Sequence, residues 1–250
     1  MLPSLFISHG SPMLALTPGP AHDFLRDLGH RYRPAAIVVV SAHWATRGLA
    51  VSTSAHPETI HDFGGFPREL YECQYPAPGE PELARRLARE LNAVPAARGL
   101  DHGAWVPLSL LFPEADIPVV SLSLPTTWSS AELVELGEKL AALFRTKEGD
   151  ENVLVIGSGS LTHNLSEMQE QGTPMPPWVG EFVDWVHEKL TTADREALLA
   201  WEQGPHALKN HPTPEHFQPL LVAMGAGGRA QRLHHSIEHG VLAMDVYAFA

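Results

Sequence analysis

The chain has 250 residues, a length that fits one large α/β domain better than two small ones. Apolar residues make up 44% of it, as in a packed globular core, and the formal net charge is −12. A strongly acidic protein repels phosphate backbones, which argues against a nucleic-acid partner. The single cysteine, Cys73, excludes an intrachain disulfide and a zinc site built from several thiolates.

The N-terminal segment has neither a basic region nor a long apolar stretch, so no signal peptide is expected. The sequence also has no run of about 18 apolar residues, which predicts that no segment spans a membrane. The cytoplasm is therefore the expected location. The fifteen histidines are the unusual feature of the composition, because they far exceed the usual share and are spread along the chain.

Short apolar, β-branched runs predict strands, and apolar residues at helical spacing predict the helices between them. Ser129 or Ser130 begins one helix, with Glu132 close behind, and Thr213 is expected to cap another that has a proline at its first position. In chain order the predicted elements are strands 4–8, 36–42 and 48–53, a loop over 56–79, helix 80–92, a helix around 105–112, strand 117–123, helix 129–145, strand 152–157, helices 178–190 and 194–202, a helix from Thr213 to about Met224, and two strands within 231–249.

The alternation of strands and helices predicts an α/β fold, with one catalytic domain over residues 1–250. Its central sheet is expected to be mixed, because the hairpin-like tail turns back near residues 238–240, and to carry helices on both faces. Residues 56–79 are rich in glycine, proline and aromatic side chains. Long structured loops of this kind often carry function in compact domains.

Three predicted strands end at or near a histidine, namely His9, His43 and His163. The ligand crevice of an open α/β sheet lies outside the carboxyl ends of its strands, where these imidazoles can converge. His102, in a turn, and His216, in the first turn of its predicted helix, can approach the same edge. Zinc and iron(II) both favour imidazole nitrogen. A single histidine at a strand end is more often structural, but three such placements favour a metal site.

The other histidines are not assigned to this site. His211 either lines the site or only shapes its loop, whereas His61 is a candidate substrate contact beside the aromatic ring of Phe63. Six histidines in polar or helical contexts are expected at the surface: His22, His30, His56, His187, His206 and His239.

Six short motifs occur in a fixed order: His9-Gly10-Ser11-Pro12, Ser41-Ala42-His43-Trp44, Ile60 to Pro67, Asp101 to Trp105, Gly157 to Leu165, and Pro212 to His216. Each motif alone is weak evidence. Together they resemble the class III extradiol ring-cleavage dioxygenases, in particular the 4,5-DOPA extradiol dioxygenase branch. The resemblance covers about residues 4–249.

The resemblance implies an oxidoreductase that opens the ring of a DOPA-like catechol next to the diol, using O2 and a divalent metal. It implies that His9, His43 and His216 are metal ligands, and that His163 is a fourth ligand or an acid/base. It also implies that His102 steers O2 or protonates an intermediate. Imidazole suits such roles because its unperturbed pKa, about 6.5, lies near neutrality.

Four residues are candidates for substrate binding: Trp44, His61, Phe63 and Arg68. Arg68 would meet a substrate carboxylate, and an exposed structural arginine is an equal alternative. Related enzymes complete the metal triad with a carboxylate, whereas the matching region here offers His216 with Glu215 beside it. If Glu215 points away from the metal, the site is all nitrogen; such a site would hold zinc comfortably and would favour iron-dependent O2 chemistry less.

Iron(II) is the expected working metal, with zinc as an occupant of the purified protein. Two alternatives stay open. One is a zinc hydrolase that uses a metal-bound hydroxide and is indifferent to O2. The other is a non-catalytic binding protein that retains the fold. The oligomeric state is open as well, with a homo-oligomer among the alternatives.

Overall fold

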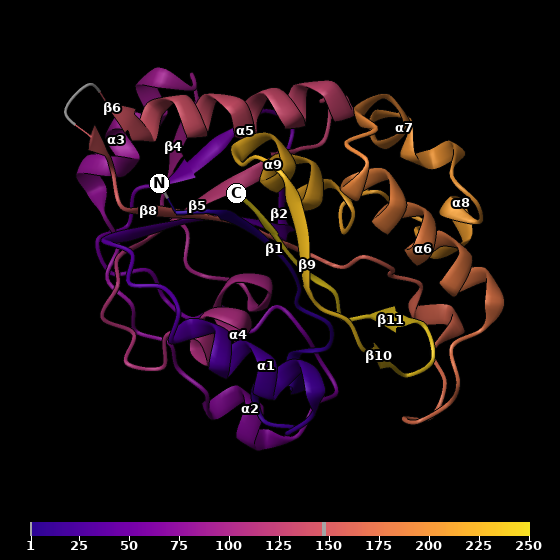
Figure 1. Ribbon diagram of the computed structural model, residues 1–250. Helices are drawn as coiled ribbons and strands as arrows, with labels where there is room; N and C mark the ends of the chain where they lie inside the picture. The colour runs from indigo at the N-terminus through magenta and orange to yellow at the C-terminus, as the bar shows by residue number, and fades with distance from the viewer. Residues whose placement is uncertain (1, 147–148) are drawn as a thin grey trace.

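A mixed eight-stranded sheet forms the centre of the computed structural model, which describes residues 2–146 and 149–250 (Figure 1). The strand order is β4-β3-β5-β2-β8-β1-β12-β9. The strands are β1 (Ser4–Ser8), β2 (Ala36–Thr46), β3 (Ala50–Ser52), β4 (Val94–Ala96), β5 (Val119–Pro125), β8 (Val153–Gly159), β9 (Ala230–His234) and β12 (Val246–Phe249). Strands β1, β2, β5 and β8 are parallel, and β12 and β9 are antiparallel additions, so the predicted mixed sheet is confirmed.

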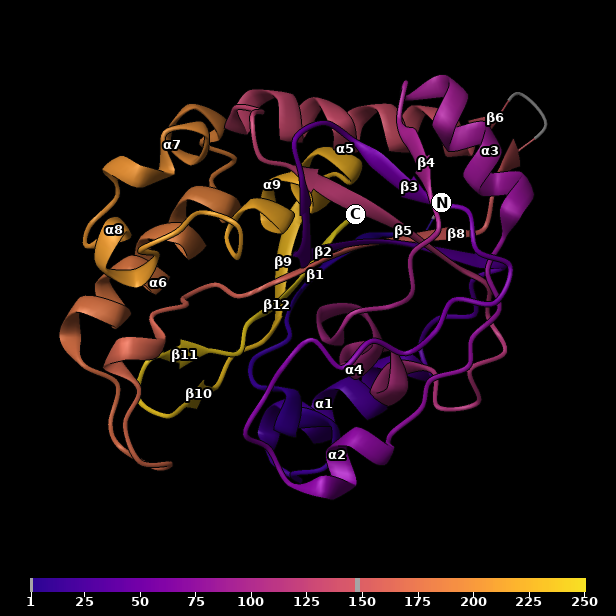
Figure 2. The same ribbon diagram turned by 180° about the vertical axis from the view of Figure 1, so that it is seen from behind.

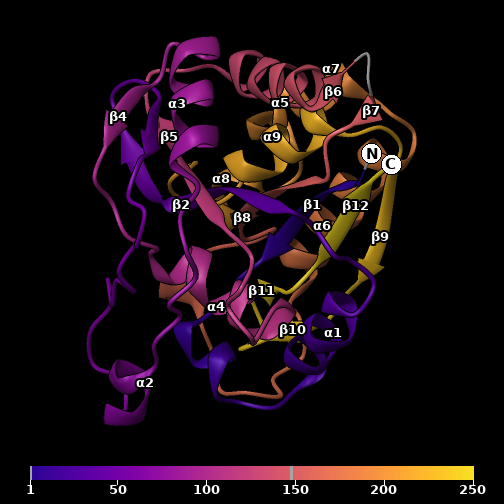
Figure 3. The same ribbon diagram turned by 90° about the vertical axis from the view of Figure 1, so that its left-hand side faces the viewer.

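Helices cover both faces of this sheet (Figure 3). On one face lie α3 (Pro81–Glu90), α5 (Ser130–Phe144) and α9 (Gln218–Ala226), and on the other lie α1 (Pro20–Gly29), α2 (Arg68–Glu72) and α4 (His102–Leu111). Helix α9 is almost wholly apolar because it is buried between α5 and strands β1 and β8. None of the helices that the structure describes is long and apolar enough to cross a membrane.

Shorter elements complete the chain beside the β9 edge and at the strand ends. Three helices lie near β9 (Figure 2): α6 (Pro177–Thr191), α7 (Arg195–Leu199) and α8 (Ala207–Asn210). Strand β6 (Arg145–Thr146) pairs with β7 (Gly149–Asp150), and a small hairpin pairs β10 (Ile237–Glu238) with β11 (Leu242–Ala243). Three 3-10 helices are η1 (Pro12–Ala15), η2 (Leu165–Glu167) and η3 (Trp201–Gln203).

Most predicted elements are present, and the differences have local causes. The Ser129 start is confirmed by a reciprocal pair of hydrogen bonds with Glu132. The predicted helix start at Thr213 is wrong, because the Thr213 hydroxyl donates to Glu215 and α9 begins only at Gln218. The tail forms four strands instead of two, and the short edge strand β4 was not predicted.

Strand β1 lies between β8 and β12, so the first strand of the chain pairs with the last. All five residues of β1 and all seven of β8 are buried. Because β1, β2 and β8 are parallel, their carboxyl ends share one edge of the sheet. This edge carries the candidate site.

Candidate functional site

Three imidazoles meet at the carboxyl ends of the central strands. His9 follows β1, His43 lies in β2, and His216 lies in the turn before α9. The Nε2 atom of His43 is 3.1 Å from Nε2 of His9 and 3.2 Å from Nε2 of His216. The end of β8 fixes the two outer residues, since the His9 N–H donates to the Gly159 carbonyl and the His216 carbonyl accepts from the Ser160 N–H, both at 2.9 Å.

Two of these rings face a carboxylate with their other nitrogen. Nδ1 of His216 lies 3.0 Å from Glu215 Oε1, and Nδ1 of His43 lies 3.6 Å from Asp62 Oδ2. An ionised carboxylate can only accept, so the proton of the His216 ring lies on Nδ1 and a lone pair remains on Nε2, whereas Asp62 faces His43 without a hydrogen bond. Glu215 therefore contacts Nδ1 of His216, on the side of the ring away from His43. The atoms that meet at the centre of the site are three imidazole nitrogens.

The third ring, His9, is held in the same way by a hydroxyl. Its Nδ1 lies 3.0 Å from Ser158 Oγ, and Ser158 donates its own proton to the Gly103 carbonyl. The Ser158 oxygen must then accept from His9, which again places the lone pair on Nε2. A Cβ atom on Gly103 would come within 3.0 Å of the His43 ring and 3.1 Å of the His9 ring, so only glycine lets α4 approach this closely.

The charge states agree with this proton arrangement. Burial is the main cause that lowers the pKa of all three imidazoles, and that of His43 falls to about 2. Burial raises the pKa of Glu215, but the hydrogen bonds from His216, its own backbone and Thr213 together outweigh it and bring the pKa to about 2. The pKa of Asp62 also falls to about 2, against the effect of burial, because His102 donates to it. The rings are neutral and the carboxylates are ionised.

This donor set fits a divalent metal ion. Three imidazole nitrogens that face one another at 3.1 and 3.2 Å repel unless a proton or a cation lies between them, and a metal ion can accept a lone pair from all three. Metal–imidazole bonds of about 2.0–2.1 Å place two nitrogens on one ion roughly 3 Å apart. Oxygen acceptors on the far nitrogens are the usual support of metal-binding histidines. A ligand atom of His102 also lies within 4.8 Å of those of His9 and His43.

Asp62 links the trio to His102, and the sequence analysis did not assign it. Its Oδ1 accepts from His102 Nδ1 at 3.0 Å and from the His102 N–H at 2.9 Å, while Oδ2 faces His43. The centroids of the His102 and His43 rings are 3.9 Å apart. Asp62 lies in the recognised motif Ile60 to Pro67. Metal-binding histidines usually need an oxygen acceptor on their second nitrogen, and this requirement is the signal that could have identified it.

His163 lies beside the trio without sharing its meeting point. Its ring stacks on His216, with centroids 3.4 Å apart and planes inclined by 7°. A ligand atom of His163 also lies within 4.8 Å of those of Glu215 and His216, a second group of side chains that could hold a metal ion. Burial lowers the pKa of His163 to about 3, and the ring lines the pocket above the site.

The pocket over these histidines has a volume of about 490 Å³. His43, His102 and His163 line it. Most of its remaining wall is apolar and comes from four separate segments: Pro12, Met13, Phe63, Phe66, Leu165, Met168 and Leu242. An apolar wall with a few polar groups at one end suits a flat aromatic ligand.

Of the four predicted substrate residues, Phe63 lines the pocket and the other three do not. Trp44 is buried beneath an arginine guanidinium that lies 5.3 Å from its ring centroid. His61 donates from Nε2 to the Cys73 carbonyl at 3.0 Å. Arg68 is exposed and pairs with Glu72 on its own helix at 2.7 Å.

Three of the remaining histidines also have defined places. His22 is buried and donates to the Leu14 carbonyl at 2.8 Å, so its predicted surface position is wrong. His211 is buried and donates to the Leu161 carbonyl at 2.9 Å, which means that it shapes the loop. His239, also expected at the surface, lines the pocket.

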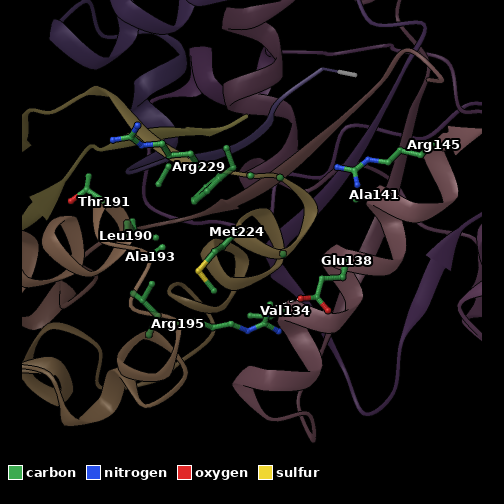
Figure 4. A pocket seen from close by; sticks show the side chains of 16 residues that line it. Val134, Glu138, Ala141, Arg145, Leu190, Thr191, Ala193, Arg195, Met224 and Arg229 are labelled. Carbon is green, nitrogen blue, oxygen red and sulfur yellow. Dashed lines mark hydrogen bonds and ion pairs between the residues drawn. The ribbon is translucent and has the colours of Figure 1, made fainter. Parts of the chain in front are cut away.

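A second hollow, of about 610 Å³, lies at the opposite edge of the sheet (Figure 4). Phe249 in its wall pairs with Ser4, the first residue of β1, whereas His9 follows the last residue of that strand. Three arginines line this hollow, and one of them, Arg195, pairs with Glu138 at 2.5 Å. Its described lining contains no histidine or cysteine, so it offers no comparable ligand set.

Comparisons with known proteins agree with the geometry. Residues 3–249 match the family model of the catalytic LigB subunit of aromatic ring-opening dioxygenase. A 4,5-DOPA dioxygenase extradiol of Beta vulgaris is 41% identical, over 98% of this chain and 96% of its own length. One from Escherichia coli K12 is 42% identical, over 90% of this chain and 85% of its own.

A solved structure matches equally well. The crystal structure of an uncharacterised protein from Escherichia coli K12 superposes with a TM-score of 0.83 and 34% identity, covering 100% of both chains. Both the sequence matches and the superposition extend over nearly the whole chain and include every strand that carries a site histidine. The chain therefore belongs to the LigB family of aromatic ring-opening dioxygenases.

Proposed function

We propose that this protein is an extradiol dioxygenase that opens the ring of a catechol with O2 at a divalent metal held by His9, His43 and His216. The observation that carries the proposal is the convergence of three Nε2 atoms, 3.1 and 3.2 Å apart, with acceptors on the Nδ1 atoms of His9 and His216. The relatives named 4,5-DOPA dioxygenase extradiol support the reaction class and the catechol substrate.

Iron(II) is the proposed working metal. Bound to the three nitrogens, it supplies a redox-active centre with open positions for the catechol oxygens and O2, a role that zinc has no redox chemistry to fill. The chain's own contribution is to keep the three imidazoles neutral and correctly turned. Glu215 and Ser158 do so by accepting the Nδ1 protons of His216 and His9, and Asp62 places its carboxylate 3.6 Å from Nδ1 of His43.

We assign proton handling to His102 and His163, which both line the pocket. Because Asp62 accepts the Nδ1 proton of His102, the His102 Nε2 is free to accept a proton from a catechol hydroxyl. The ionised Asp62 then stabilises the imidazolium. His163, stacked on His216, presents a second imidazole to the substrate and acts as an acid/base, not as a fourth ligand.

The apolar wall holds the catechol ring and excludes water from it. Phe63 and Phe66 meet edge to face, with centroids 5.3 Å apart, and Met168 and Leu165 line the pocket as well. An aromatic ring placed among them is oriented by packing, while its two hydroxyls reach the histidines.

The test is to strip the metal with a chelator, reload the protein anaerobically with iron(II) or with zinc, and add O2 and a catechol. We expect the iron(II) form to consume O2 and release a coloured ring-opened semialdehyde, and the zinc form to be inactive. No O2 uptake by the iron(II) form with any catechol would contradict the proposal. Turnover by the zinc form that ignores O2 would favour a hydrolase instead.

A further inference from the structure

The β10–β11 hairpin carries an unusually constrained histidine into the pocket. His239 has a φ of 49°, a left-handed conformation that is costly for a residue other than glycine. Three hydrogen bonds to a single neighbouring segment hold it there. Its N–H donates to Gln171 Oε1 at 3.0 Å, its Nδ1 donates to the Gln169 carbonyl at 3.1 Å, and its carbonyl accepts from the Gln169 N–H at 3.0 Å.

These contacts decide what His239 offers to a ligand. With the Nδ1 proton donated to Gln169, the neutral ring keeps a lone pair on Nε2. Within the described chain, Nε2 has no hydrogen-bond partner, and the residue lines the pocket. A strained backbone that is over-determined by its surroundings is a common mark of a ligand-binding position.

Glu238 brings a carboxylate to the same place. It pairs with Leu242 across the hairpin, so the two side chains share one face, and Leu242 lines the pocket. Glu238 Oε2 lies 3.8 Å from the position that a Cβ on Gly10 would occupy, and Gly10 lines the pocket too. Burial raises the pKa of Glu238, and neither of its oxygens has a hydrogen-bond or ion-pair partner among the residues described. A partly buried carboxylate without a partner is costly unless a ligand completes it.

The charge of the pocket selects the ligand. None of the described residues that line it is a lysine or an arginine. The hairpin therefore presents two acceptors, one of them anionic, and no fixed cation. A substrate tail that ends in an ammonium group satisfies both acceptors, whereas a tail that ends in a carboxylate meets like charge.

We propose that Glu238 and His239 bind the ammonium group of an amine-bearing catechol and so determine the substrate specificity of the enzyme. The inference rests on the proposed function and goes beyond it, because it names the substrate side chain that the pocket recognises and the two residues that bind it. An amino-acid tail is recognised through its ammonium end.

The test compares four catechols that differ in their tails: dopamine, DOPA, 3,4-dihydroxyphenylpropionate and 4-methylcatechol. We expect kcat/KM of the iron(II) enzyme to be about tenfold higher for dopamine than for 4-methylcatechol, mainly through KM. Glu238→Gln should remove this preference and leave 4-methylcatechol within about twofold. His239→Leu should lower kcat/KM for dopamine and DOPA by about fivefold.

Glu170→Gln is the matched control, because Glu170 is exposed, lies on the segment that faces the hairpin, and carries the same charge. It should change none of the ratios. An unchanged dopamine preference in Glu238→Gln, or a wild-type preference for the carboxylate tail, would overturn the inference.

Calorimetric binding of the same catechols to the zinc-loaded protein separates this inference from the proposed function. We expect dopamine to bind about tenfold more tightly than 4-methylcatechol, and Glu238→Gln to abolish the difference. If no catechol is cleaved but this Glu238-dependent affinity persists, the proposed function fails and the inference stands. If catechols are cleaved and bound without regard to their tails, the inference alone fails.

Discussion

Two groups of histidines lie in this molecule, and only one has the geometry of a metal site. In the first group, Nε2 of His9, His43 and His216 meet at 3.1 and 3.2 Å. The second group, His187, His234 and His235, lies where α6 meets β9 and β12. It contains as many rings, and two of them face the buried strand residues Tyr247 and Asp245.

In the second group, each engaged nitrogen has a partner of its own. Nδ1 of His187 lies 3.1 Å from the Tyr247 hydroxyl, and Nδ1 of His235 lies 2.9 Å from Asp245 Oδ2. Nε2 of His234 lies 2.8 Å from the Ser236 hydroxyl.

The difference teaches that the number of histidines is a weak guide to a metal site. What distinguishes the first group is that its three Nε2 atoms face one another, whereas the engaged nitrogens of the second group face hydroxyl or carboxylate oxygens.

Removing one imidazole of the first group should have the largest effect on metal binding and ring cleavage. His43 contacts both other rings, so His43→Ala should abolish stoichiometric metal binding and lower ring cleavage by at least about a thousandfold. The matched variant in the second group, His187→Ala, should keep both. Metal content by mass spectrometry and O2 uptake give the two readouts. A His43→Ala protein that still bound one metal ion would break the distinction between the groups.

Replacing Asp62, the carboxylate beside His43 and His102, should have the second-largest effect on metal affinity or turnover. Asp62→Asn weakens the acceptor for His43 and His102, so we expect a loss of about 10–100-fold in metal affinity or turnover. Asp245→Asn, beside His235, should leave metal affinity unchanged and lower the free energy of unfolding by about 1–3 kcal/mol. Competition with a chelating dye and urea denaturation measure these quantities. Equal effects of both variants on metal affinity would contradict the comparison.

Glu215 should have a smaller effect, because it contacts His216 and leaves the meeting point to nitrogen. We expect Glu215→Ala to weaken metal binding about tenfold, and Glu215→Gln, which keeps an oxygen acceptor for Nδ1, only a few-fold. The chelator competition described above would measure both. A complete loss of metal in Glu215→Gln would show instead that the carboxylate is itself a ligand.

The smallest effect should come from the pH dependence of the second group. The hydrogen bond to Asp245 raises the pKa of His235 while burial opposes it, and Arg232 and Asp184 also face the ring. A pKa raised in the folded state means that the protonated ring stabilises the fold below its unfolded pKa, about 6.5, and that this contribution is lost as the pH rises through the folded pKa. Urea denaturation should therefore show stability declining slightly above about pH 6.5, relative to His235→Gln. An identical pH profile in both proteins would contradict the assignment.

The sequence predicted the parts of the site that depend on strand periodicity. The apolar runs that form β1 and β2 locate His9 and His43 at the strand ends without any knowledge of tertiary contacts. His216 was placed in a helix, because the local signal at Thr213 takes no account of the competing hydrogen bond to Glu215.

The supporting residues were beyond the reach of such patterns. Asp62 meets His102 across 40 positions, and His239 meets Gln169 across 70. No local periodicity records either contact. His239 was expected at the surface because its neighbours in the sequence are polar, whereas its place in the pocket follows from how the hairpin packs against residues 169–171.

The spacing of the three imidazoles along the chain has a consequence for protein synthesis. His43 and His216 are 173 positions apart, and β1 needs β12, the last strand, as its neighbour. A growing chain that has left the ribosome only as far as α5 carries two of the three nitrogens and lacks one side of the central sheet. The complete ligand set thus forms only after His216 has been made, so a nascent chain that stops at α5 cannot hold a metal ion with all three nitrogens.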